Sequence, residues 1–349
     1  MTSPITSTTR FNTFNGSSFH AGPRPGSVVP AAPGNLDTDY DVAQILTAAQ
    51  IESIHNSGIM AFHTFGDSGT DDHHNGDADT RLSVAEQMEA ECTAKAGQPD
   101  NPCFCFHLGD VIYPSGNEHL YEEEFYQPYR GYGNAILAIP GNHDYYGDRL
   151  ASFAENFNAS ELRIAPGTRP AMNLPWFYFT LQTPVATIIG LATVSNNIDW
   201  QQRAWFCAQM KAADPNKALI VATHYAPYCF DGTDNSAIRD CLEEAITATG
   251  RKPDLVIAGH SHTYQRMTAP DYPVLVIGTG GVGTSHLGRY GNGATWQAGS
   301  NKVYGAVTLT LDANAREIRG AFTVGASTDG SHAPGDVLDR FHYPWNSQN

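Results

Sequence analysis

Residues 59–69, IMAFHTFGDSG, contain the unit that decides the fold of this 349-residue chain. A mostly apolar run ends at Phe65, and Gly66 and Asp67 follow it directly. An apolar run of this length, bounded by a glycine, is typical of a buried strand that delivers a polar side chain into a loop. Comparable apolar runs end just before Asp110, Asn142, His224 and His260.

The order of these units predicts an α/β fold. Open α/β sheets bind ligands at the carboxyl ends of their strands, so the five strand ends are expected to converge on one point. Apolar spacing and N-cap residues predict helices over about 42–54, where Asp39 or Asp41 is the expected cap, and over about 82–92, 200–208 and 236–249. Apolar runs at 274–278, 304–311 and 318–324 lack intervening helices and predict a second, mixed sheet packed on the first.

The charge of the chain limits its partners. Lys and Arg number 20 against 36 Asp and Glu, which leaves a formal net charge of −16. Nonspecific binding to nucleic acid or to an anionic membrane requires a basic face, so neither is expected. No apolar run reaches the roughly 18 residues of a transmembrane helix, so no membrane span is expected.

The polar residues at the strand ends are metal ligands by type. Two are hard carboxylates, one is a phenol, one is an amide oxygen and three are imidazoles. Such a set can hold two ions roughly 3.5–4 Å apart, bridged by one carboxylate, which clamp the attacking and leaving oxygens of an in-line displacement. Each residue alone has a simpler explanation as a turn, cap or exposed residue, but their combination favours a two-metal centre. The seven candidates are Asp67, Asp110, Tyr113, Asn142, His224, His260 and His262.

The ordered blocks GDSG 66–69, GDVIY 109–113, GNHD 141–144, His224 and GHSH 259–262 resemble those of the calcineurin-like metallophosphoesterases, and within them the purple acid phosphatases. The resemblance covers roughly residues 59–324. It implies a two-layer β core flanked by helices, that is, an α/β four-layer α/β/β/α sandwich of two mixed sheets.

The resemblance also implies how the ligands divide between the ions. Asp67, Tyr113 and His262 are expected on Fe(III). Asn142, His224 and His260 are expected on a divalent ion, which would be Fe(II), Zn or Mn. Asp110 is expected to bridge the two.

One substitution favours the purple acid phosphatase subgroup. Most metallophosphoesterases carry a histidine ligand at the position of Gly69, so this chain lacks that donor. Tyr113 is where the purple acid phosphatases restore it with a phenolate, and a hard anionic oxygen favours a hard trivalent ion. Roughly +5 from the two ions and roughly four negative ligand charges leave about +1 for an anionic substrate. The resemblance further places His143 against the substrate, where it stabilises or protonates the phosphoryl group, with Asp144 orienting it.

The implied function is that of a binuclear-metal phosphoric ester hydrolase. We expect an acid phosphatase that uses a metal-bound hydroxide for in-line attack on the phosphorus of a small phosphorylated substrate. One alternative is a phosphodiesterase acting on cyclic nucleotides or lipid head groups. Another is a metal-binding protein without catalysis. Histidines in polar or Gly-rich loops that could line the substrate mouth are His73, His74 and His286.

Three segments are expected along the chain: an extension over 1–58, partly irregular with one helix, a catalytic domain over 59–330 and a tail over 331–349. The N-terminus lacks the basic start and apolar segment of a secretory signal. That indicates a cytoplasmic protein, or a secreted or periplasmic one whose signal has been removed. The cysteines leave disulfides open, either Cys229 with Cys241 or Cys92 with Cys103 or Cys105.

Overall fold

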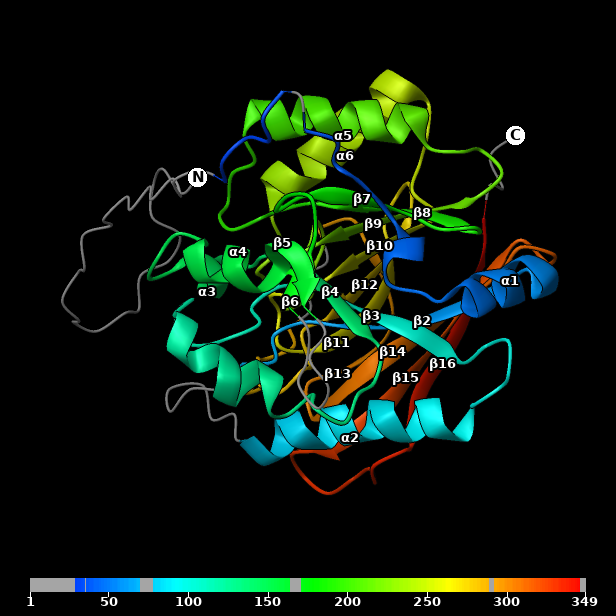
Figure 1. The fold of residues 1–349 in the computed structure, drawn as a ribbon. Coiled ribbons are helices and arrows are strands. Elements are labelled where there is room, and N and C mark those ends of the chain that lie inside the picture. The colour runs from blue at the N-terminus through cyan, green and yellow to red at the C-terminus, as the bar shows by residue number, and fades with distance from the viewer. Residues whose placement is uncertain (1–28, 35, 70–77, 164–170, 289–291, 346–349) are drawn as a thin grey trace, which may run out of the picture.

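The computed structural model describes residues 29–34, 36–69, 78–163, 171–288 and 292–345. Two mixed sheets face each other in its centre (Figure 1). The eight-stranded sheet has the order β1 (Asp39–Asp41), β7 (Phe179–Gln182), β8 (Ala186–Gly190), β9 (Ala218–Thr223), β10 (Leu255–Ala258), β12 (Pro273–Ile277), β11 (Tyr264–Thr268), β13 (Thr295–Ser300). The six-stranded sheet has the order β16 (Val337–Pro344), β15 (Glu317–Ser327), β14 (Val303–Asp312), β2 (Ile59–Phe65), β3 (Pro102–His107), β4 (Ala135–Ala138).

Helices cover the outer faces of both sheets, so the predicted four-layer α/β/β/α sandwich is confirmed (Figure 1). α5 (Trp200–Ala212) and α6 (Ser236–Thr249) pack together over the eight-stranded sheet. α2 (Ala78–Ala94) lies on β14 and β15 of the six-stranded sheet. The remaining elements are α1 (Ala48–Ser57), α3 (Asn142–Tyr145), α4 (Ala151–Phe157), the hairpin β5 (Asn158–Arg163) and β6 (Ala171–Asn173), the 3₁₀ helices Val42–Gln44 and Glu118–Leu120, and a π-helical turn, Glu122–Tyr126.

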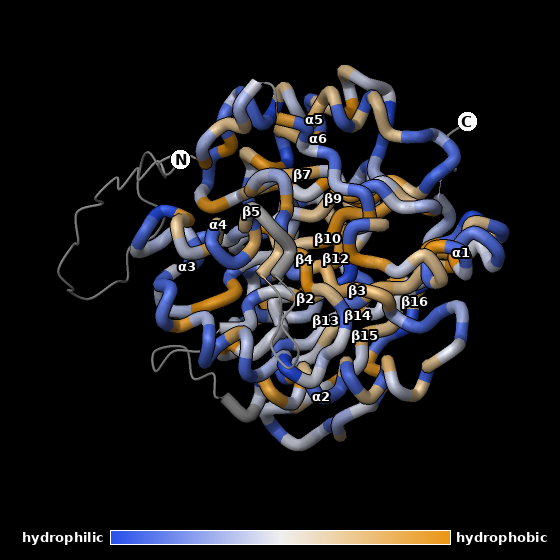
Figure 2. Tube along the Cα trace, in the orientation of Figure 1, coloured by the Kyte–Doolittle hydropathy of each residue, from blue (hydrophilic) through white to orange (hydrophobic). Residues whose placement is uncertain are grey.

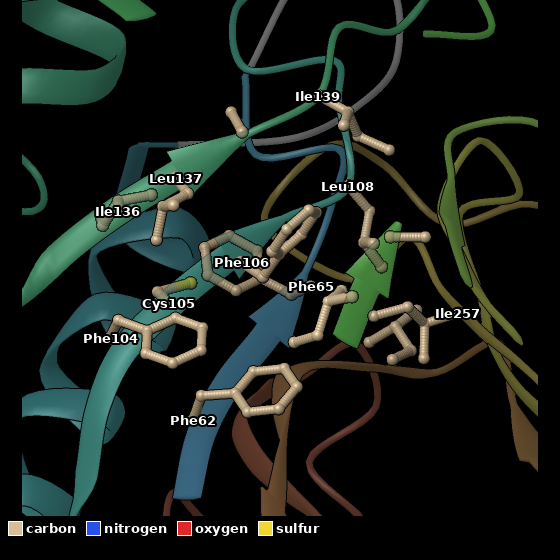
Figure 3. Close-up of a cluster of buried hydrophobic side chains, with 14 of the residues drawn as sticks. Phe62, Phe65, Phe104, Cys105, Phe106, Leu108, Ile136, Leu137, Ile139 and Ile257 are labelled. Carbon is tan, nitrogen blue, oxygen red and sulfur yellow. The ribbon is translucent and has the colours of Figure 1, made fainter. Parts of the chain in front are cut away.

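The main core fills the space between the sheets. Phe62 of β2 stacks on Phe104 of β3 with ring centroids 4.8 Å apart, and Ile257 of the opposite sheet lies in the same cluster (Figure 3). Burying one such aromatic side chain contributes roughly 1.5–3 kcal/mol. The central strands are the most hydrophobic part of the trace, whereas the outer helices alternate between polar and apolar residues (Figure 2). Burial on both faces explains why these strands read as continuous apolar runs.

Local capping sets the helix boundaries. Asp199 accepts hydrogen bonds from the first-turn N–H groups of α5, and Asn235 does the same for α6, which ends at the left-handed Gly250. The single helix expected over 42–54 was wrong, because two shorter elements occupy that segment. Asp41 caps only the 3₁₀ helix, and the side chains of Thr47 and Gln50 form a capping box that starts α1 anew.

The segment expected to be a C-terminal tail instead supplies β16, which pairs antiparallel with β15. Charged and polar residues interrupt its apolar residues and only Phe341 is buried, as suits an edge strand, and this hid it in the sequence. Asp339 fastens it to the other sheet by accepting hydrogen bonds from Arg266 Nε at 2.6 Å and Tyr264 Oη at 2.8 Å. At the other end, β1 of the expected N-terminal extension pairs in parallel with β7.

Two further points concern open questions from the sequence. All six cysteines are unpaired, so neither suggested disulfide forms. None of the helices in the described segments is long and apolar enough to cross a membrane.

Candidate metal centre

The five strand ends singled out by the sequence do meet, but they come from two sheets. β2, β3 and β4 are parallel neighbours in the six-stranded sheet, and β9 and β10 are parallel neighbours in the eight-stranded sheet. The carboxyl edges of both sets face one another. The candidate ligands therefore occupy the seam between the two sheets.

The first group of donors surrounds the hydroxyl of Tyr113. This oxygen lies 3.2 Å from Asp67 Oδ1 and 3.2 Å from His262 Nε2, and the latter two atoms are 3.6 Å apart. Tyr113 and Asp67 are fully buried. The phenol thus points into the centre and does not merely pack its ring beside the loop.

The second group of donors surrounds His224. Ligand atoms of Asp110, His224 and His260 all lie within 4.8 Å of one another. His224 Nε2 is also 3.1 Å from the amide oxygen of Asn142. With metal–ligand bonds of roughly 2.0–2.2 Å, neighbouring ligands are about 3.0–3.5 Å apart. The spacing around the Tyr113 hydroxyl and the distances from His224 Nε2 to Asn142 and to Asp110 Oδ2, 3.1 and 3.2 Å, fit this range.

One oxygen atom belongs to both groups. Asp110 Oδ2 accepts a hydrogen bond from the Tyr113 hydroxyl at 2.9 Å and lies 3.2 Å from His224 Nε2. The other oxygen, Oδ1, accepts a hydrogen bond from the backbone N–H of His143 at 2.7 Å. Asp110 is therefore the carboxylate placed between the two donor groups.

The backbone at these positions is strained. Asp67, Asp110 and His260 have φ angles of 61°, 54° and 68°, in the left-handed region that side chains with a Cβ seldom adopt. Each such residue costs about 1–3 kcal/mol, and strain of this kind clusters at functional sites. Each of the three directly follows a glycine at the end of a strand, which turns the chain sharply so that the side chain faces the seam.

Backbone carbonyls fix the orientation of the histidines. His224 Nδ1 lies 2.8 Å from the carbonyl oxygen of Leu108, and His262 Nδ1 lies 2.8 Å from that of Gly283. The imidazole N–H must be the donor in each pair, so Nε2 is the nitrogen that faces the other candidate ligands and would bind an ion once deprotonated.

His143 lies beside the donors. Its ring stacks at 4.1 Å on the ring of Tyr113, and its Nδ1 lies 2.9 Å from the carbonyl oxygen of Pro114. Asp144, which was expected to orient His143, uses its carboxylate to accept the backbone N–H groups of Asp110, Val111 and Gly141 at 2.8–3.0 Å. Asp144 thus positions the loops after β3 and β4.

Gly69 leaves room for Tyr113. A Cβ at position 69 would lie 2.4 Å from the ring carbon Cδ2 of Tyr113 and 2.6 Å from its backbone nitrogen. The tyrosine therefore occupies the space that a side chain in the first block would need. The glycine that stands at position 69 in place of the usual histidine therefore also makes room for the Tyr113 ring.

The site holds two buried carboxylates with no lysine or arginine partner among the described residues. Burial raises the pKa of Asp67 to about 8, and the charge of Asp110 adds to this effect. Burial opposes protonation of His224, but the charge of Asp110 raises its pKa to about 9. A bound cation would hold Asp67 ionised as well as Asp110, and would displace the proton from His224.

Two residues that hold the site in place were not predicted from the sequence. Thr193 Oγ1 accepts the backbone N–H groups of His224 and Tyr225, each at 3.0 Å. It follows β8 and could have been found by the same strand-end rule. Glu124 is buried and accepts the N–H of Tyr113 at 2.8 Å, but no pattern marks it in the sequence.

The remaining histidines separate into three cases. His107 Nε2 lies 2.9 Å from Ser68 Oγ, and His63 is buried in a separate cluster with Glu91. His286 is exposed on its loop. His73 and His74 lie outside the described residues.

A family model identifies the class of this protein. The calcineurin-like phosphoesterase model matches residues 64–264, more than half of the chain, and contains all seven candidate ligands. The chain therefore belongs to the calcineurin-like phosphoesterase family. Phosphoesterases of this family use a pair of divalent metal ions. No curated protein matches the sequence.

Solved structures share the fold at low sequence identity. GAP50, the anchor in the inner membrane complex of Plasmodium, is 14% identical with a TM-score of 0.61, over 82% of this chain and 89% of that one. The purple acid phosphatase PPD1 of yellow lupin is 16% identical with a TM-score of 0.61, over 82% of this chain and 54% of that one. PhoD is 12% identical with a TM-score of 0.55, over 82% and 70%. The chain thus spans about half the length of the lupin protein.

Proposed function

We propose that this chain is a binuclear-metal phosphoric ester hydrolase, most specifically an acid phosphatase acting on small phosphomonoesters. The observation that carries the proposal is the position of Asp110 Oδ2, which contacts Tyr113 in one donor group and His224 in the other. A carboxylate shared in this way is what a two-ion centre requires. Residues 59–330 would form the catalytic domain.

The two donor groups differ in hardness, and this guides the assignment of the ions. Asp67, Tyr113 and His262 would hold Fe(III), because a phenolate is a hard anionic ligand. Asn142, His224 and His260 would hold Fe(II), Zn or Mn, since an amide oxygen and two neutral imidazoles suit a divalent ion. The steric fit of Tyr113 against Gly69 supports the phenol as the replacement for the missing first-block histidine.

Bound ions would act as Lewis acids and activate water for in-line attack on phosphorus. The chain itself would position the substrate and move one proton. His143 is held through its backbone N–H to Asp110 and through Nδ1 to Pro114, so Nε2 would be its catalytic atom. Nε2 can donate a proton to the leaving oxygen or stabilise charge on the phosphoryl group. Asp144 would act indirectly, by holding the loops that carry Asp110 and His143.

The fold alone does not decide among the possible functions, because fold and function separate in large families. GAP50, described as an anchor, shares the fold as closely as the lupin phosphatase does. The argument for catalysis is therefore the complete donor set together with His143.

Hydrolysis of p-nitrophenyl phosphate and of bis-p-nitrophenyl phosphate, with elemental analysis of the same sample, tests the proposal. We expect two metal ions per chain, at least one of them iron, and faster turnover of the monoester. Faster turnover of the diester would make the protein a phosphodiesterase. Bound metal without turnover of either ester would make it a non-catalytic metal-binding protein, and zinc alone or one ion in total would refute the iron assignment.

A further inference from the structure

Tyr225 lies against the second donor group but has no part in the ligand set. It directly follows His224, and its ring stacks on that of His260 with centroids 3.9 Å apart and an angle of 37°. The ring also meets His224 edge to face at 5.6 Å. One phenol therefore covers both imidazoles that would hold the divalent ion.

Tyr225 lies close to Tyr146 and Asp110. Burial raises the pKa of its hydroxyl, and the nearby charges of Tyr146 and Asp110 add to this effect. The ring of Tyr146 in turn packs at 5.3 Å against His143, the proposed proton donor. The ring of Tyr225 thus lies beside the second donor group, near the pair formed by Tyr146 and His143, and a phosphate on the divalent ion would be bound next to it.

Among the described residues, this hydroxyl has no hydrogen-bond partner. Only 3% of Tyr225 is exposed, yet among the described residues its hydroxyl makes no hydrogen bond, whereas the Tyr113 hydroxyl contacts three candidate ligands. Buried tyrosine hydroxyls usually find a partner. The Tyr225 oxygen is not among the fully enclosed unpartnered atoms, so a ligand can reach it.

We infer that Tyr225 is a further catalytic residue, whose hydroxyl donates a hydrogen bond to a non-bridging phosphoryl oxygen of the substrate. The inference rests on the proposed function. Charge on these oxygens grows in the transition state, and preorganised donors there accelerate phosphoryl transfer. In the described part of the chain, the contacts of the candidate ligands include no lysine or arginine. A neutral hydrogen-bond donor such as the Tyr225 hydroxyl would therefore help to stabilise the negative charge on the phosphoryl oxygens.

Tyr225→Phe tests this inference, because it retains the ring that stacks on His260 and removes only the oxygen. Tyr228→Phe is the matched control. Tyr228 lies on the same loop, is equally buried, and packs its ring under the guanidinium of Arg239 at 5.1 Å, away from the donors. We expect Tyr225→Phe to lower kcat/KM for p-nitrophenyl phosphate about 10- to 100-fold and to weaken inhibition by inorganic phosphate. Metal content and Tm should match the wild type, and the control should stay within about twofold.

A kcat/KM within twofold of the wild type in Tyr225→Phe would overturn the inference. Loss of metal from this variant would also overturn it, because Tyr225 would then support the ions and not the substrate. A metal-loaded wild type without phosphoesterase activity would defeat the proposed function instead. In that case calorimetric binding of inorganic phosphate still decides the role of Tyr225, and equal affinity in wild type and variant would refute it.

Discussion

Two clusters of buried histidines and carboxylates in this protein differ in how their charges are balanced. At the seam between the sheets, Asp67 and Asp110 contact phenol, imidazole and backbone groups only. Beneath α2, Glu91 pairs with Lys95 at 3.1 Å and with His63 Nε2 at 3.3 Å. The second cluster lies beside a groove of about 990 Å³ between α2 and the outer face of β14–β16.

The pKa values of the carboxyl groups in the two clusters reflect how their charges are balanced. At the seam, burial raises the pKa of Asp67 to about 8, whereas for Asp110 burial is outweighed by the charge of His224, which holds its pKa well below its usual range. Burial also opposes ionisation of Glu91, but the hydrogen bond and charge of His63, together with Thr308 and Lys95, lower its pKa to about 2. The two clusters differ in that Glu91 has a lysine partner, whereas the described contacts of the carboxylates at the seam include histidines but no lysine or arginine. This comparison leads to four predictions.

The largest effect should follow the loss of the shared carboxylate. Asp110→Asn keeps the shape and an oxygen to accept the His143 N–H, but removes the charge that both donor groups contact. We expect activity to fall by about 10³-fold or more, since several kcal/mol of charge stabilisation are lost, and metal content to drop. Asp67→Asn should cost less, because only one ion would lose a ligand. An Asp110→Asn enzyme with two tightly bound metals and a near-normal rate would end the bridging assignment.

His143→Ala should separate catalysis from metal binding. The ring packs on Tyr113 and touches the centre from the side, so its loss should leave both ions in place. The rate should fall by about 10²–10⁴, as is typical for a lost general acid. Elemental analysis alongside kinetics checks this, and loss of metal would make His143 a ligand.

Tyr113→Phe should change the spectrum more than the fold. A phenolate on ferric iron absorbs visible light, so the iron-loaded wild type should be coloured and the variant should lose the band. The ring still fills the space beside Gly69, so we expect a Tm close to that of the wild type. Weaker retention of iron during dialysis should accompany the spectral loss. A colourless iron-loaded wild type, or an unchanged spectrum in the variant, would contradict the phenolate assignment.

The smallest effect on activity should come from a change in the cluster beneath α2, where Glu91 pairs with Lys95 and His63. Glu91→Gln should lower the free energy of unfolding by about 1–3 kcal/mol at pH 7, because Lys95 and His63 lose a charged partner, while activity stays within about twofold. The folded-state pKa of Glu91 is depressed from 4.5 to about 2. Its stabilisation is therefore complete above about pH 4.5 and is lost as the pH falls toward 2. Denaturant unfolding of both proteins from pH 7 to pH 3 should show the difference shrinking, and a constant difference would refute it.

Much of the architecture followed from local patterns. β2 ends at Phe65, where the apolar run was expected to end, and α6 covers the predicted residues 236–249. These elements combine strong apolar runs or stripes with clear end signals. β16 lacked such a signal because an edge strand need not be apolar. The start of α1 was misjudged because two cap sequences lie six residues apart, at Asp41 and Thr47.

The sequence by itself determined the family, the layered fold and the set of candidate ligands, since a glycine and a ligand at each strand end are written locally. Only the tertiary structure decided which sheet supplies each donor and that Asp110 Oδ2 lies between the two groups. It also decided that Asp144 holds backbone N–H groups and that Tyr225 covers His260. These relations join residues from different strands, and their distances depend on how the two sheets pack, which no local pattern encodes.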